Sequence, residues 1–174
     1  SFIKNEKLDS KKLIENKLDL AAIYWNLSLS NLLRGDYKNG FKNYEYRMYL
    51  SDPIMPHARP ISQRITDKLS IKERTKILLI SEQGLGDTIQ FIRYSLYLKQ
   101  IGFKVTLCCL KKLHSLVEFS NICDYLISPN DAVKIYDIPW VPLLSLPKLL
   151  KINSDNVLIN DKYLDIPKNR IQYW

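Results

Sequence analysis

The fold of this chain follows from one stretch, Lys76-Ile-Leu-Leu-Ile-Ser-Glu-Gln-Gly-Leu-Gly-Asp-Thr-Ile-Gln-Phe-Ile-Arg-Tyr94. The branched aliphatic run at 77–80 suits a strand that is buried on both faces of a parallel sheet. Gly84 and Gly86 can take positive φ and let another molecule approach the backbone closely. Apolar residues at helical spacing follow, so the order is strand, loop, helix. In open α/β sheets, ligands bind at such a loop, outside the carboxyl end of a strand.

The rest of the second half alternates strand-like and helix-like segments. Further strands are predicted at 104–110, 125–127 and 134–138. One long helix is expected from the glycine loop to Gly102, and another near 113–119. A last helix is expected over 144–150, with Ser145 as its cap and Pro147 in its first turn. This alternation predicts an α/β fold with a Rossmann-like parallel sheet.

The first 50 residues show helical spacing. A short helix is expected from about Ser10, and a stronger pattern begins at Asp19. Gly35 suits a left-handed helix cap, and Asp36 can cap the segment that follows. Aromatic and apolar residues at 37, 41, 44 and 48 then predict a second amphipathic helix. Two helices joined by a Gly-Asp turn form a helical hairpin.

The chain therefore divides into three predicted regions, a helical hairpin at 1–50, a connector at 51–75 and an α/β lobe at 76–174. Prolines in the connector exclude helix from the residue before each of them. With 174 residues, of which 46% are hydrophobic, the chain can bury one good core, or a modest core plus a small appended module.

The composition and the first residues predict where in the cell the protein is located and whether its cysteines are reduced. The chain has no run of about 18 apolar residues, so no membrane span is predicted. Its first residues, Ser-Phe-Ile-Lys-Asn-Glu, lack the apolar centre of a signal peptide, which makes the cytoplasm the expected location. Cysteines at 108, 109 and 123 fit neither a disulfide framework nor the paired spacing of a zinc site. They are interpreted as reduced core residues, and no metal or cofactor is predicted.

The net charge of +8 invites a test for an anionic partner. Residues 1–87 hold 15 basic and 11 acidic side chains, and residues 88–174 hold 11 and 7, so each half carries +4. A nucleic-acid surface needs its basic residues clustered on one face. The dispersed excess mainly supports solubility, and nucleic-acid binding is not the favoured function.

The hairpin resembles a tetratricopeptide repeat. Six residues match that family's helix-packing positions, namely Tyr24, Leu27, Ser28, Asn31, Gly40 and Tyr44. Arg47 departs from the pattern, since a small residue is usual there, and Pro53 lies close to the family's closing proline. One repeat cannot bury its faces alone. Either repeats precede this chain, with residues 1–17 as a remnant of one, or the hairpin docks on the domain behind it.

The wider combination resembles bacterial tetratricopeptide proteins with a glycosyltransferase region related to the ADP-heptosyltransferases. The string Glu82-Gln-Gly-Leu-Gly-Asp-Thr-Ile-Gln90 is its most specific part, and Leu143-Leu-Ser-Leu-Pro147 adds to it. The resemblance implies a GT-B enzyme with two Rossmann-like lobes, an acceptor lobe first and a nucleotide-sugar lobe second. Only the first lobe is expected within these 174 residues. The chain alone is therefore expected to be inactive.

The resemblance also assigns site residues. A Gly-Asp pair after the first strand supplies the general base on the acceptor hydroxyl, and Gly86-Asp87 matches it. The competing interpretation is that Asp87 or Thr88 simply caps the helix. Substrate-binding positions are expected at Glu82, Gln83, Gly84, Gly86, Thr88 and Gln90. Glu82, Gln83 and Gln90 either bind sugar hydroxyls or brace the loop.

Two alternatives to this site are weak. The Gly84-Leu-Gly86 loop lacks the third glycine of a dinucleotide fingerprint, and no carboxylate follows in the second strand to hold a ribose. His57 and His114 stand alone in the sequence, without a paired ligand or nucleophile, and are interpreted as surface or packing residues.

Two functions of different class remain. The first is the acceptor-side lobe of a glycosyltransferase, which acts on a nucleotide sugar and a hydroxyl acceptor in the complete enzyme. The second is a protein-interaction module, in which the helical hairpin binds a protein partner and the α/β lobe has no catalytic role.

Overall fold

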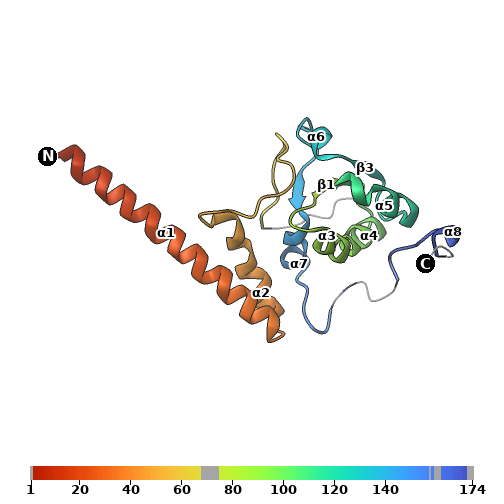
Figure 1. The fold of residues 1–174 in the computed structure, drawn as a ribbon, viewed down its shortest axis with the longest axis horizontal. Coiled ribbons are helices and arrows are strands. Elements are labelled where there is room, and N and C mark those ends of the chain that lie inside the picture. The colour runs from red at the N-terminus through yellow and green to blue at the C-terminus, as the bar shows by residue number, and fades with distance from the viewer. Residues whose placement is uncertain (1, 68–74, 157, 159–161, 172–174) are drawn as a thin grey trace. The chain divides into compact units, whose positions relative to one another are not determined.

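A computed structural model describes residues 2–67, 75–156, 158 and 162–171 (Figure 1). The chain separates into two compact units, Ser1–Ile54 and Met55–Trp174. Part of the predicted connector, at 68–74, lies outside the described residues, as does the end of the chain at 172–174. Within the described residues, no helix combines the length and apolar character that crossing a membrane requires.

The first unit begins with one unbroken helix, α1, over Phe2–Leu33. The short helix expected from about Ser10 and the stronger pattern from Asp19 are parts of this one helix, because no glycine or proline interrupts the backbone hydrogen bonds in this stretch. The second helix, α2, covers Tyr37–Tyr44 and passes into a 3-10 helix, η1, over Glu45–Tyr49. The predicted second helix is therefore present, but its last turn is tighter than an α-helix.

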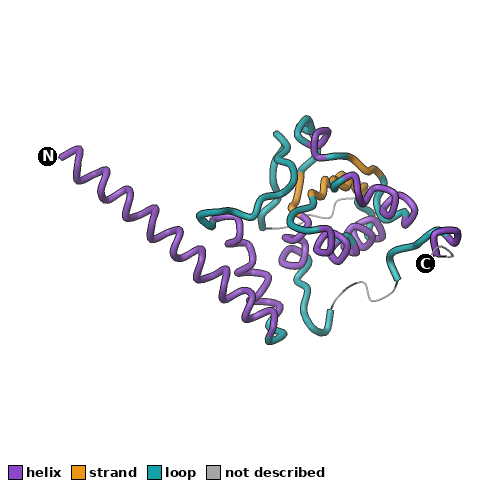
Figure 2. Tube along the Cα trace, viewed as in Figure 1, coloured by secondary structure: helices purple, strands orange, loops and turns teal. Residues whose placement is uncertain are grey.

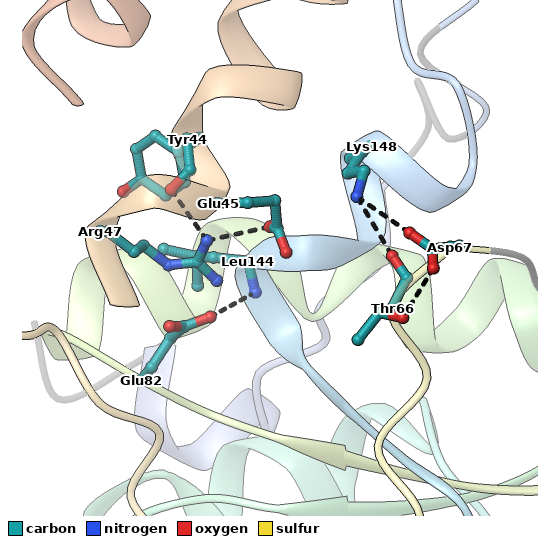
Figure 3. A network of polar contacts seen from close by, with 8 residues as sticks. All are labelled: Tyr44, Glu45, Arg47, Thr66, Asp67, Glu82, Leu144 and Lys148. Atoms are coloured by element: carbon teal, nitrogen blue, oxygen red, sulfur yellow. Dashed lines mark hydrogen bonds and ion pairs between the residues drawn. The ribbon is translucent and has the colours of Figure 1, made fainter. Parts of the chain in front are cut away.

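Arg47 lies in that tighter turn and is completely buried. Its Nη1 donates to the Tyr44 carbonyl at 3.0 Å and to Glu45 Oε1 at 3.0 Å (Figure 3). Its guanidinium also lies over the Tyr44 ring, 4.9 Å from the ring centre. The long side chain, where the repeat pattern has a small residue, thus satisfies a carbonyl at the end of α2.

The turn between the two helices follows the sequence prediction. Gly35 has φ of +79°. Its N–H donates to Leu32 O, and the N–H of Asp36 donates to Asn31 O, which is the Schellman arrangement. Asp36 then caps α2 by accepting from the backbone N–H and the side-chain amide of Asn39. These two hydrogen bonds lower the pKa of Asp36.

Small and aromatic residues hold the hairpin together. Ala21 and Ser28 are buried on α1. A Cβ atom placed on Gly40 would lie only 2.6 Å from Leu32 Cδ2, so α1 and α2 approach as closely as a glycine allows. Two aromatic pairs join α1 to the segment that follows the turn. Tyr24 stacks on Tyr46, and the rings of Trp25 and Tyr44 lie tilted by 49° with their centres 4.9 Å apart.

The second unit is built on a four-stranded parallel sheet in the order β3-β2-β1-β4. The strands are β1 Lys76–Ile80, β2 Lys104–Cys108, β3 Tyr125–Ile127 and β4 Trp140–Pro142. Residues 77–80 are all completely buried, so both faces of the central strand are covered. The predicted α/β fold with a parallel sheet is confirmed.

The predicted fourth strand at 134–138 is wrong. Lys134 and Ile135 donate their N–H groups back to Asp131 and Ala132, which extends the turn after α6, Pro129–Ala132. Ile135 and Ile138 pack instead against the core cluster around Leu78, Ile80 and Trp140. The fourth strand lies a few residues later, at Trp140–Pro142, and the second strand ends at Cys108 instead of residue 110.

Two helices of this unit are shorter than predicted, whereas the helix expected near 113–119 is present as α5, His114–Ser120. The long helix expected before Gly102 is divided at Ile92 into α3, Leu85–Phe91, and α4, Arg93–Gln100. Gly102 ends α4 with φ of +98°, as predicted. Ser145 is the N-cap residue of α7, Leu146–Leu149, and Pro147 lies in its first turn, as predicted, although the Ser145 side chain makes no capping hydrogen bond. The remaining helices are η2 Lys111–Leu113, η3 Leu143–Ser145 and α8 Lys168–Ile171.

The connector is part of the second unit from Met55 onward. The N–H of Trp140 donates to Gln63 O at 3.0 Å, and the N–H of Ile65 donates to Trp140 O at 2.9 Å. These loop residues therefore run along the outer edge of β4 (Figure 2). Ala58, from the same segment, is buried in the core cluster.

Candidate functional site

The candidate site is the loop between β1 and α3, at the carboxyl end of the central strand. Its one residue with left-handed backbone is Gln83, with φ of +60°. The expectation that Gly84 or Gly86 takes positive φ is wrong, because Gly84 has φ of −82° and Gly86 lies within α3. A left-handed residue other than glycine costs about 1 kcal/mol or more, and such strain is concentrated at functional sites.

Glu82 is held inside the fold. It is completely buried, and its Oε1 accepts the N–H of Leu144 at 3.0 Å (Figure 3). Its backbone pairs with Pro56 of the connector. Glu82 therefore links the carboxyl ends of β1 and β4, and these contacts favour the bracing role over direct binding of a sugar hydroxyl.

Asp87 occupies the third position of α3. Its Oδ2 accepts the N–H of Gly84 at 3.1 Å. Only this half of a capping box can form, since Gly84, the residue at the N-cap, has no side chain. The interpretation of Asp87 or Thr88 as the N-cap is therefore wrong, although Asp87 does satisfy a backbone donor. The side chain of Asp87 is half-buried, and Oδ1 accepts no hydrogen bond from the described residues.

The other predicted site residues differ in what they can offer a ligand. Thr88 is 1% exposed and donates its hydroxyl to Gly84 O at 3.1 Å, so it braces the loop. Gln83 is half-buried, and Gln90 is exposed on α3. Gly86 is exposed, and a Cβ atom built on it would meet no heavy atom within 4 Å. Packing in the described structure thus gives no reason for a glycine at 86.

Replacing Gly86 with Ala separates stability from ligand binding. Alanine favours helix over glycine, so the variant should gain up to about 1 kcal/mol in the free energy of unfolding. If a ligand approaches the backbone at Gly86, the added methyl group should weaken its binding. Urea unfolding and a ligand titration on the same protein measure the two effects. A fall in stability would contradict the open space above Gly86.

His57 joins this region from the connector, which the sequence interpretation missed. Its Nδ1 lies 2.7 Å from Ser81 Oγ, and its backbone N–H donates to Ser81 O at 2.9 Å. Ser81 follows β1 directly and is completely buried. No local pattern could reveal this pair, because the two residues are 24 positions apart. The Nε2 of His114, by contrast, lies 3.1 Å from the Cys109 carbonyl oxygen, a contact that suits a structural role.

The cysteines do not provide a nucleophile. Burial raises the pKa of the Cys108 and Cys109 thiols to about 12, and that of Cys123 to about 11. Thiols of this kind are inert. Across the part of the chain that the structure describes, no three His, Cys, Asp or Glu side chains gather in a way that could hold a metal ion.

A shallow pocket of about 350 Å³ lies between α5 and β3. Its lining includes Val117, Glu118, Asn121 and Tyr125. Because Tyr125 is the first residue of β3, the pocket lies at the amino end of that strand, whereas the glycine loop follows the carboxyl end of β1. The pocket is therefore not part of the candidate site.

Comparisons of the chain with protein-family models, with curated protein sequences and with solved structures find no match. The functional argument therefore depends on the geometry of the site and on the motif at 82–90.

Proposed function

We propose that the α/β unit is the acceptor-side lobe of a cytoplasmic glycosyltransferase of the GT-B kind, similar to the ADP-heptosyltransferases. One observation carries the proposal. At the carboxyl end of the central parallel strand, a half-buried carboxylate on Asp87 stands beside Gly86, which has open space above it. A ligand at this edge is the usual arrangement in open α/β sheets.

In this proposal Asp87 is the general base. The acceptor hydroxyl gives its proton to Oδ1 while its oxygen attacks the anomeric carbon of the sugar, and the bond to the nucleoside diphosphate breaks with the electron pair leaving on the phosphate oxygen. The hydrogen bond from the Gly84 N–H to Asp87 Oδ2 holds the carboxylate in one orientation. The open space above Gly86 lets the acceptor reach it. The nucleotide sugar would be bound by a second lobe.

The second candidate is a protein-interaction module of the tetratricopeptide type. The close approach at Gly40 and the buried Ser28 support a repeat-like hairpin. Apolar side chains remain exposed on α1, with Ile23 61% and Leu33 90% accessible, and a protein partner would cover such residues. In this case the α/β unit has no catalytic role.

A nucleotide-sugar assay tests the proposed function. The chain is expressed together with any further residues that its gene encodes, and release of nucleoside diphosphate is measured with a panel of nucleotide sugars. Release that depends on an acceptor is the expected result. Calorimetry on residues 1–174 alone should show no saturable binding of UDP-, GDP- or ADP-sugars at micromolar concentration. Tight binding there would mean that the glycine loop itself holds the nucleotide, and would contradict the acceptor-lobe assignment.

A further inference from the structure

Next to the division between α3 and α4 lies Tyr163, a residue distant in sequence from both helices. Tyr163 donates its hydroxyl to the Ile89 carbonyl at 3.0 Å. The Arg93 guanidinium lies over the Tyr163 ring, 4.7 Å from its centre, and Arg93 Nε donates to Gln90 O at 2.9 Å. Two neighbouring carbonyls beside the helix break thus have side-chain donors, and Tyr163 contributes one of them.

The segment around Tyr163 is anchored a second time. The N–H of Asp165 donates to Ser120 Oγ at 2.9 Å, at the end of α5. Tyr163 is therefore tied to two helices of the same unit and is half-buried between these anchors. This attachment places a fixed hydrogen-bond donor against α3 from outside the helix.

The helix that receives this contact carries the candidate site. α3 has only seven residues, and helices this short depend on tertiary contacts for their stability. At its first turn Gly84, Asp87 and Thr88 are cross-linked by hydrogen bonds. At the other end of α3 the Ile92 N–H donates to Thr88 O at 3.0 Å. A hydrogen bond therefore joins Thr88, in the first part of α3, to Ile92, where α3 and α4 divide.

We propose that Tyr163 is a positioning residue for the candidate site. By holding the Ile89 carbonyl it fixes the orientation of α3, and with it the direction in which Asp87 presents its free oxygen. This inference deepens the proposed function and rests on it, because the orientation of Asp87 matters only if that residue contacts a substrate.

The test uses the chain of 174 residues and needs no substrate. Tyr163→Phe removes the hydroxyl and keeps the ring that Arg93 covers. Amide hydrogen exchange is then followed residue by residue by NMR. The hydroxyl donates to Ile89 O at 3.0 Å and accepts a longer hydrogen bond from Arg93 Nη2 at 3.4 Å. Loss of these contacts should raise exchange at Gly84, Thr88 and Ile92 about fivefold. The amides of β1 and β2 should exchange as they do in the unaltered chain.

Tyr136→Phe is the matched control, because Tyr136 is 76% exposed and loses the same hydroxyl. It should leave exchange in α3 unchanged. The inference is overturned if Tyr163→Phe leaves Gly84 and Thr88 unchanged, if its effect is confined to residues 92–95, or if exchange rises equally in β1. Because no activity is measured, failure of the glycosyltransferase assignment would leave this result intact and is detected separately by nucleoside diphosphate release.

Discussion

If Asp87 is the proposed general base, replacing it with Asn should lower turnover of the proposed glycosyltransferase about 100-fold or more while leaving the protein folded. Asparagine keeps an oxygen that can accept the Gly84 N–H, which Asp87 Oδ2 accepts at 3.1 Å. It cannot take a proton from the acceptor hydroxyl at neutral pH. Steady-state release of nucleoside diphosphate measures turnover, and urea unfolding measures stability.

Asp87→Ala is the companion variant, since it removes both the base and the hydrogen bond to Gly84. It should lose turnover to a similar degree and also about 1 kcal/mol in the free energy of unfolding. If Asp87 serves only the helix terminus, Asn is neutral in both assays and Ala affects stability alone. That pair of results would remove the catalytic role.

Replacing Gly40 with Ala should destabilise the hairpin, although alanine normally strengthens a helix. The new Cβ atom would lie 2.6 Å from Leu32 Cδ2 and 3.2 Å from the Leu32 backbone nitrogen, so either the Leu32 side chain must shift or α1 and α2 must separate. Overpacking of this kind costs about 1 to 3 kcal/mol. Urea unfolding, followed by amide exchange at residues 19–44, measures the loss of stability.

Gly86→Ala is the matched control for Gly40→Ala, because it makes the same change in a helix where the Cβ atom meets nothing within 4 Å. The two variants should differ in the sign of their effect on stability. Adding Leu32→Ala to Gly40→Ala should recover part of the lost stability, because it removes the side chain that the new Cβ atom would overlap. Equal stability changes at the two glycines would contradict the close approach of α1 and α2.

Local signals in the sequence identified the features that depend on a few neighbouring residues. The short strand β3 was predicted with correct bounds, and β1 was predicted to within one residue at its start. The positive φ at Gly35 was also predicted, because only glycine takes that conformation without a Cβ penalty, and Gly102 was predicted to end a helix, which it does.

Features that depend on distant partners were missed. β4 pairs with β1, which lies more than 60 residues earlier in the sequence. The apolar residues at 134–138 had a strand pattern as good as that of β4 itself. The division of the long helix at Ile92 is accompanied by contacts from Tyr163, which no local pattern contains. At the site, the motif located the loop and Asp87, whereas the His57 and Ser81 pair needed the fold.

The connector residues along β4 also have a consequence for solubility. An unpaired strand edge offers its N–H and C=O groups to another chain and is a route to aggregation. Here both backbone groups of Trp140 are already engaged, by Gln63 and Ile65. The outer edge of the sheet at β4 is therefore closed to strand addition at this residue, and partial detachment of 63–65 would be the step that makes the unit prone to self-association.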